Sequence, residues 1–229
     1  VRSRNIIPLK MAPLVYAGTL LTHFFGGSAG REGTAVQMST AIADQFTGLF
    51  KLTKQERKII LIIGISGGFS SVFGTPLTGA IFAIEVLYFS RISFKSILPS
   101  FLPAYIAFYT VELLHIPHTH YPKPYFPEIH LNIIPWLVFA GIVFGLTARI
   151  FSTTVHFIQL NVKSLITYPP LRPFYGGLIF AAVIYFSGAT QYLGLGIPTI
   201  LESFKYAQDG EVFLLKLIAT AFILGTGFK

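Results

Sequence analysis

The sequence has 229 residues, of which 53% are hydrophobic and 11% are charged, and its mean hydropathy is +0.67. A water-soluble domain carries about 25% charged residues, so this composition excludes an ordinary soluble protein and indicates an integral membrane protein. The absence of cysteine excludes disulfides and thiolate metal sites. Most of the net charge of +8 falls in short gaps between apolar runs, where membrane proteins keep their basic residues, so we expect no nucleic-acid partner.

Apolar runs follow one another along the chain, and most are shorter than the roughly 20 residues that cross a bilayer as a helix. In chain order, we expect helical runs at 11–25, 34–50, 59–73, 77–89, 96–114, 133–160, 173–188 and 212–224, with an irregular stretch at 192–206. Short runs interrupted by Gly and Pro are typical of discontinuous helices, which membranes tolerate only where the break faces protein or water. The pattern predicts an all-α, polytopic membrane protein with broken helices, of the transporter or channel class.

Residues 26–38 read Gly-Gly-Ser-Ala-Gly-Arg-Glu-Gly-Thr-Ala-Val-Gln-Met and place two charges between glycines. Charges at membrane depth cost about 2.5–3.5 kcal/mol each, so they indicate function. A helix that restarts after the glycines points its free N–H groups and its positive dipole end forward, which favours an anion. We expect Glu32 to be a protonatable gate whose carboxylate competes with the anion. The alternative is a structural pair in which Arg31 and Glu32 neutralise each other. The expected anion-binding residues are Gly30, Arg31, Glu32, Gly33 and Thr34.

Two motifs resemble those of the CLC family of anion channels and proton-coupled antiporters. Residues 27–33, Gly-Ser-Ala-Gly-Arg-Glu-Gly, are similar to its signature. Residues 73–85, Phe-Gly-Thr-Pro-Leu-Thr-Gly-Ala-Ile-Phe-Ala-Ile-Glu, resemble its Phe-x-x-Pro-Leu-x-Gly-x-x-Phe-x-x-Glu helix. Looser similarities follow at 194–198 and 225–229. The resemblance extends over essentially the whole chain and implies a CLC-like fold with an inverted repeat.

The resemblance also implies a domain organisation. Residues 1–115 would form the C-terminal part of a first repeat, 116–131 a loop linker and 132–229 the N-terminal part of a second repeat, all in one transmembrane domain. The family implies a homodimer with one pore per subunit. Neither end of the chain reads as a natural terminus, and no signal-peptide pattern is present, so we expect an internal fragment. The family's remaining anion contacts, a serine-bearing turn, a second backbone turn and a tyrosine, would then lie outside it.

By the same resemblance, Glu32 corresponds to the external gating glutamate, and the backbone N–H groups of Glu32 and Gly33 face the central anion. Glu85 is a candidate for a proton or water path, with a solvated helix-end residue as the alternative. The possible start of a second anion-contacting turn comprises Gly227, Phe228 and Lys229.

Departures from the common pattern bear on the transported ion. Thr34 stands where most chloride-handling members carry proline, and residues 30–38 with the terminal Gly-Phe-Lys resemble the bacterial fluoride-exporting branch. Val86 occupies the position of the second proton-transfer glutamate of chloride/proton antiporters, which argues against ordinary chloride/proton exchange. Fluoride, a strong hydrogen-bond acceptor, needs converging donors. Thr34 either adds one hydroxyl to such a site or merely occupies the first turn of the helix.

We therefore expect fluoride/proton antiport, with a small anion and protons as substrates, in the bacterial inner membrane. The protein would be a transporter that works without a cofactor and is not an enzyme. A chloride channel or a chloride-selective CLC transporter is the alternative in the same class. A purely structural membrane subunit would leave Arg31 and Glu32 unexplained.

A histidine group near a proline-rich stretch suggests a metal site, and with it an intramembrane metal-dependent enzyme as a rival function. The spacing matches no helical ligand pair and no His-Glu-x-x-His motif, so we expect a solvated loop without metal. Arg149 lies on the long run and either borders a wet vestibule or extends to the membrane surface. The histidines are His115, His118, His120 and His130.

Pairs of glycines four residues apart permit close helix packing. They occur at 26 and 30, at 64 and 68, and at 141 and 145. For the last two pairs we expect a packing role without chemistry.

Overall fold

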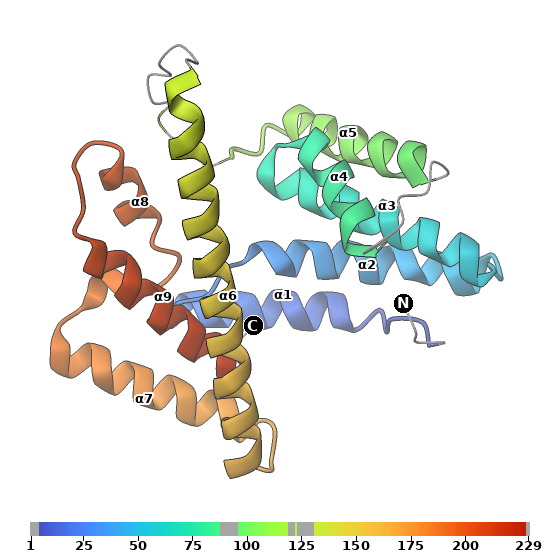
Figure 1. Cartoon of the computed structure of the whole chain (residues 1–229). Helices are drawn as coiled ribbons and strands as arrows, with labels where there is room; N and C mark the ends of the chain where they lie inside the picture. The colour runs from blue at the N-terminus through green and yellow to red at the C-terminus, as the bar shows by residue number, and fades with distance from the viewer. Residues whose placement is uncertain (1–4, 88–95, 119–121, 123–130, 228–229) are drawn as a thin grey trace. The chain divides into compact units, whose positions relative to one another are not determined.

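The structure is a computed structural model that describes residues 5–87, 96–118, 122 and 131–227 (Figure 1). This part of the chain is helical and contains no strand, so the all-α prediction is confirmed there. The α-helices are α1 (Met11–Phe24), α2 (Glu32–Leu49), α3 (Lys54–Phe73), α4 (Pro76–Leu87), α5 (Ile97–Leu113), α6 (Ile134–Leu165), α7 (Leu171–Ser187), α8 (Ile197–Ser203) and α9 (Gly210–Gly225). The structure also describes two 3₁₀ turns, η2 (Leu131–Ile133) and η3 (Thr190–Tyr192).

Several helices are too short to cross a membrane alone. α1, α5, α7 and α9 have 14, 17, 17 and 16 residues, whereas about 20 residues at 1.5 Å each span 30 Å of hydrocarbon. The expected short, interrupted helices are therefore confirmed for these elements. The end of the expected 77–89 run lies outside the described residues.

The chain divides into two compact units, which are described separately. One comprises residues 1–21 and 30–120, and the other comprises 22–29 and 121–229. The short segment 22–29 is thus built into the second unit, although the chain on both sides of it belongs to the first. The assignment of the halves to inverted repeats stays a prediction.

In the first unit, α3 is the central helix and contacts α2, α4 and α5. Small residues bring α2 and α3 together: a methyl group added at Gly64 would lie 2.8 Å from the Thr40 Cα. Gly68 abuts Ser39 in the same way, and the Ser39 hydroxyl donates to the Gly64 carbonyl at 2.7 Å. The packing role expected for this pair is confirmed. A methyl group at Gly141 or Gly145, by contrast, would meet no described atom within 4 Å.

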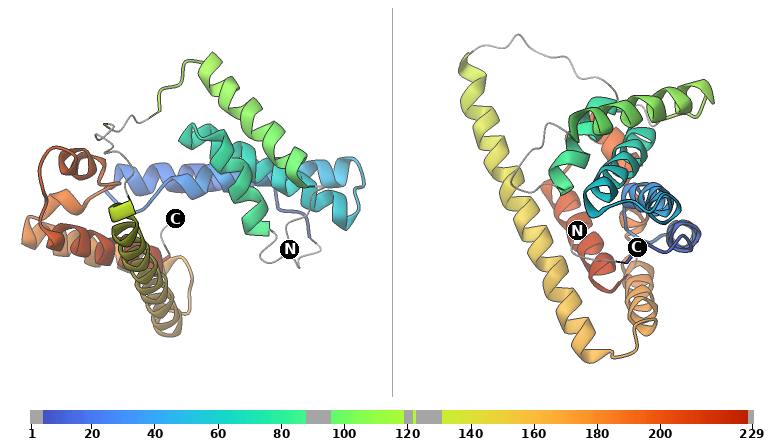
Figure 2. Two further views of the ribbon diagram at one scale, coloured as in Figure 1. Left: turned by 45° about the horizontal axis from the view of Figure 1, so that its top comes forward. Right: turned by 90° about the vertical axis from the view of Figure 1, so that its right-hand side faces the viewer.

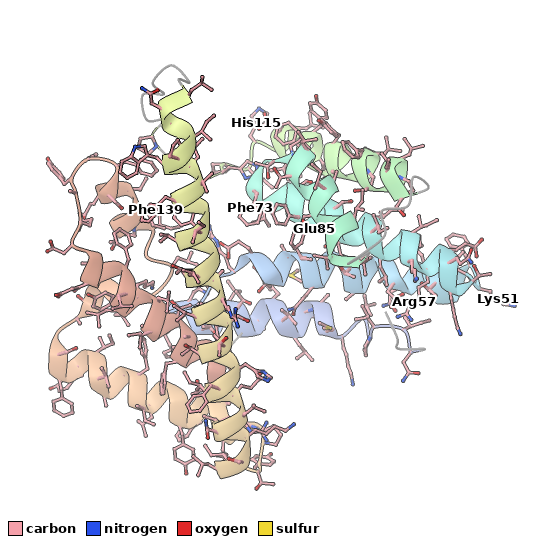
Figure 3. All side chains as sticks on the ribbon, viewed as in Figure 1. Lys51, Arg57, Phe73, Glu85, His115 and Phe139 are labelled. Atoms are coloured by element: carbon pink, nitrogen blue, oxygen red, sulfur yellow. The ribbon has the colours of Figure 1, made fainter. Side chains whose placement is uncertain are left out.

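A buried ion pair fastens the beginning of the chain to α2 and α3. Arg57 Nη2 lies 2.6 Å from Asp44 Oδ2, and its Nε donates to Oδ1 at 2.8 Å. Asp44 also accepts the Ile7 N–H at 2.8 Å, and Figure 3 shows Arg57 near the start of α3. Because the carboxylate is fully buried, loss of the arginine would leave an unpaired buried charge, at a cost of about 3–5 kcal/mol.

Helix α3 begins earlier than the apolar run 59–73 predicts. The cause is a capping box: the Glu56 N–H donates to the Thr53 hydroxyl, while the Thr53 N–H donates to the Glu56 carboxylate at 2.7 Å. These bonds satisfy N–H groups at the helix start, so the basic residues from Lys54 onward are helical. The helix ends at Phe73, and Gly74 caps it in the left-handed conformation, with φ +64°.

In the second unit, α9 contacts α6, α7 and η3. Its apolar core joins Ala29 from the early segment with Phe180, Ile184, Tyr192 and Ile223. The stretch 192–206, expected to be irregular, contains the helix α8. Pro198 stands in its first turn, where the fixed φ of proline favours a helix start.

Helix α6 is the longest element and runs beyond the expected 133–160. Residues 131–165 form the one stretch in the described part of the chain that is long and apolar enough to cross a membrane, and Figure 2 shows it without a break. None of its residues is buried, so its large side chains, such as Trp136 and Phe144, are exposed.

Candidate anion site at the start of α2

The break before α2 is rich in glycine, and the helix that follows it has no side-chain cap at its N-terminus. Gly26 follows α1 with φ +75°, a conformation that costs glycine little. Helix α2 then begins at Glu32, and the preceding Arg31 forms no side-chain hydrogen bond to the helix start. Helices commonly cap this end with a Ser, Thr, Asp or Asn oxygen. Arginine has no such oxygen, so the cap position leaves the first N–H groups for another acceptor.

The N–H groups expected to face the anion are those of Glu32 and Gly33. The next one, of Thr34, donates to the Arg31 carbonyl at 3.1 Å. Gly30, Arg31 and Gly33 are exposed, and Glu32 is half-buried. The first turn therefore presents donors and the positive end of an 18-residue helix, as an anion site requires.

The Glu32 carboxylate folds back toward the glycine that precedes it. A methyl group placed on Gly30 would lie only 2.6 Å from Glu32 Oε2, so the absence of a side chain there makes room for the carboxylate. Arg31 forms no ion pair with Glu32 among the described residues. The structure thus lends no support to a mutually neutralising pair and places the acid beside the start of its own helix.

Thr34 makes a contact that links two helices. Its hydroxyl oxygen lies 2.5 Å from that of Thr19 in α1, and Thr19 is buried. The hydroxyl therefore does more than occupy the first turn, because it joins α1 to the start of α2. Whether it also contacts an anion stays a prediction.

The other proposed site residues are more dispersed. Glu85 is exposed near the end of α4 (Figure 3), and Gly227 follows α9 with φ +100°. Phe228 and Lys229 lie outside the described residues, as do His120 and His130. The roles given to these residues stay predictions.

Two of the histidines are described, and one has a local structural contact. His118 Nδ1 lies 3.1 Å from the Val72 carbonyl oxygen in the last turn of α3, and His115 follows α5 with φ +53°. Within the described ranges, no three His, Asp or Glu side chains gather as metal ligands. Arg149 is exposed on α6.

The sequence reasoning missed a lysine inside the apolar run 212–224. Lys216 of α9 donates from Nζ to the carbonyls of Tyr192, at 2.9 Å, and Gly194, at 2.5 Å. A lone cation in an apolar run is the signal that could have found it, because hydropathy alone marks the run only as a helix.

Comparison with known proteins identifies the family. The family model described as "Voltage gated chloride channel" matches residues 1–229. A chloride/fluoride channel protein of Pseudomonas syringae pv. tomato is 45% identical over 99% of this chain and 51% of its own length. A voltage-gated ClC-type chloride channel of Escherichia coli is 26% identical, with 91% of this chain and 50% of the relative covered.

A solved structure gives the same result for the fold. The crystal structure of a CLC-type fluoride/proton antiporter matches with a TM-score of 0.89 and 31% identity, over 97% of this chain and 56% of that one. The chain therefore spans about half the length of the relatives it matches, and the CLC-like fold prediction is confirmed. On these matches, the chain belongs to the voltage-gated chloride channel family of integral membrane proteins.

Proposed function

We propose that the natural protein containing this chain exchanges fluoride for protons across a bacterial inner membrane, with Glu32 as the protonatable gate. The protein is a transporter rather than an enzyme, uses no cofactor and works as a homodimer in the lipid bilayer. Its substrates are a small anion and protons.

One observation carries the proposal: an acidic side chain stands at the first residue of a helix whose cap position leaves its N–H groups for another acceptor. The Glu32 carboxylate and a small anion are stabilised by the same donors and the same helix dipole. Only one of them occupies the space at a time. The 31% identity to a fluoride/proton antiporter supports fluoride as the anion.

The mechanism follows from that competition. While Glu32 is ionised, its carboxylate lies beside Gly30 and keeps the anion out. A proton removes the charge and with it the attraction to the helix start, so that the carboxyl group leaves and the anion takes the N–H groups. Return of the carboxylate displaces the anion and requires loss of the proton, which couples the two fluxes in opposite directions.

A chloride channel is the second candidate, because two similar proteins bear channel names. In that case Glu32 would open and close a continuous pore, and protonation would change the open fraction without a fixed ratio of anions to protons.

Ion fluxes in liposomes separate the two candidates. The natural protein that contains these 229 residues is reconstituted, and fluoride efflux, chloride efflux and proton movement are recorded with ion-selective and pH electrodes. The proposal expects fluoride efflux well ahead of chloride efflux, with protons driven uphill by a fluoride gradient. Comparable chloride flux without proton movement would establish the channel instead.

A further inference from the structure

Lys216 is a charged residue in an otherwise apolar helical segment. The rest of α9 from Val212 to Leu224 is otherwise free of charged residues, and Lys216 is half-buried. An ammonium group in such a segment costs about 2.5–3.5 kcal/mol on insertion scales and is retained for a reason. Its partners are two backbone carbonyls, those of Tyr192 and Gly194.

One carbonyl is that of the last residue of η3 and the other lies in the turn between η3 and α8, and the lysine stem packs against the same turn. Gly194 and Gly196 have φ +60° and +75°, and a methyl group on Gly196 would lie 3.1 Å from Lys216 Cε. Lys216 therefore holds the turn through both its ammonium group and its aliphatic stem.

This turn is also hydrogen-bonded to the beginning of the glycine-rich break before α2. The Gly194 N–H donates to the Gly26 carbonyl at 3.0 Å. Two residues later, the fully buried Ser28 hydroxyl lies 2.9 Å from that of Thr220. Because Thr220 is one helical turn after Lys216, the two ties start from the same face of α9.

We propose that Lys216 is a positioning residue that, with Thr220, fixes the segment Gly26–Ala29 from which the chain continues directly into Gly30 and Glu32. This inference rests on the proposed function of Glu32. A gate that alternates between two positions needs a fixed start to its helix, since otherwise carboxylate and anion do not compete for one place. Lys216 acts on the gate through backbone carbonyls and does not touch the anion.

Hydrogen exchange tests the positioning itself, independently of transport. In the natural protein, Lys216→Met removes the ammonium group and keeps most of the stem, whereas Lys216→Arg retains the charge. Exposed Lys205, two residues after the end of α8, gives the matched control Lys205→Met. Loss of hydrogen bonds from a charged donor is expected to speed amide exchange in residues 26–30 about tenfold. Lys216→Arg should restore much of the protection, and Lys205→Met should match the wild type. Unchanged exchange at 26–30 in Lys216→Met would overturn the proposal, whatever the protein transports.

Transport in liposomes then tests the consequence. Lys216→Met is expected to release about tenfold more fluoride per proton than the wild type, because a loosened break lets anions pass without the carboxylate returning. Ammonium side chains also attract anions, and Lys216 borders a cavity of about 160 Å³. A rise in the half-saturating fluoride concentration with an unchanged fluoride-to-proton ratio would mean such a role and would overturn positioning. If Lys216→Met does not fold, Thr220→Val removes the second hydrogen bond to the break and must shift the amide exchange rate and the fluoride-to-proton ratio in the same direction.

The absence of proton movement in the wild type would instead refute the proposed function. The amide exchange result would still decide whether Lys216 positions the break.

Discussion

Among the glycine breaks of the described residues, the one before α2 and the one between α3 and α4 both lead into a new helix and are completed differently. Between α3 and α4, Gly74 takes the left-handed conformation, its N–H donates to the Ser70 backbone carbonyl at 3.0 Å, and Pro76 starts the next helix. These are ordinary stop and start devices. Before α2, the helix start lacks a side-chain cap and carries Glu32 as its first residue.

A structural break and a functional one differ in what satisfies the backbone donors at the start of the new helix. The break between α3 and α4 carries no charge, and the N–H of its Gly74 is satisfied by the Ser70 carbonyl. A functional break leaves donors to be satisfied by something that comes and goes, and here a carboxylate and an anion are the two candidates.

The largest effect is expected for Glu32→Gln. The amide keeps the size of the side chain but accepts no proton, so proton flux coupled to fluoride should fall by about 100-fold or more, to the background leak. Fluoride and proton fluxes recorded together in liposomes measure this loss. Glu85→Gln is a useful companion, since it alters an exposed acid on α4 instead. Coupled exchange that persists in Glu32→Gln would remove the gate from Glu32.

Gly30→Ala should weaken the coupling without unfolding the protein. The added methyl group meets the mobile end of Glu32 at 2.6 Å, so the carboxylate must move while the backbone stays. We expect exchange to slow by roughly 10-fold, the size of effect that follows from misplacing a reacting group. Gly18→Ala adds the same methyl group in α1 where no described atom lies within 4 Å and serves as the control. Equal rates for both variants would mean that the carboxylate does not rest beside Gly30.

At the other break, Gly74→Ala should reduce stability and leave coupling intact. Alanine in the left-handed conformation costs about 1–2 kcal/mol, and its methyl group would lie 3.1 Å from the His118 ring. Thermal unfolding in detergent should show a lower Tm, while the fluoride-to-proton ratio of the folded fraction stays at the wild-type value. A changed ratio would give this break a role in transport that the account denies it.

The smallest effect is expected for Thr34→Val, which removes one hydroxyl. If that hydroxyl only binds Thr19, then Thr34→Val, Thr19→Val and the double variant should each lose about 1 kcal/mol of stability and keep the preference for fluoride. Tm and the ratio of fluoride to chloride efflux are measured for both single variants and the double variant. Together they decide whether the Thr34 hydroxyl only binds Thr19 or also contacts the anion. A drop in fluoride preference in Thr34→Val alone would show that the hydroxyl reaches the anion.

Hydropathy and glycine patterns predicted most of the helices because a membrane selects apolar helical segments and Gly and Pro mark where they break. They failed where helix-start residues outside an apolar run shape an element: the capping box that starts α3 at Lys54, and Pro198 at the start of α8. The position of Glu32 at the first turn of α2 was also readable, since charges and glycines are adjacent in sequence.

Contacts between distant residues were out of reach. Nothing local to Thr34 points to Thr19, and nothing local to Lys216 points to Gly194. Such pairs depend on how the helices pack, and a single sequence does not predict which helix faces contact each other. The presence of a lone lysine in an apolar run was readable, but its partners were not.

The most direct test places the two breaks side by side in one experiment. The natural protein is reconstituted in liposomes as the wild type and as the variants Glu32→Gln and Gly74→Ala. Uphill proton movement driven by a fluoride gradient is then measured per folded protein. The account predicts proton movement in wild type and Gly74→Ala and none in Glu32→Gln. Proton movement in Glu32→Gln, or its loss in both variants, would contradict the claim that the start of α2 is the gate and the α3–α4 turn is structural.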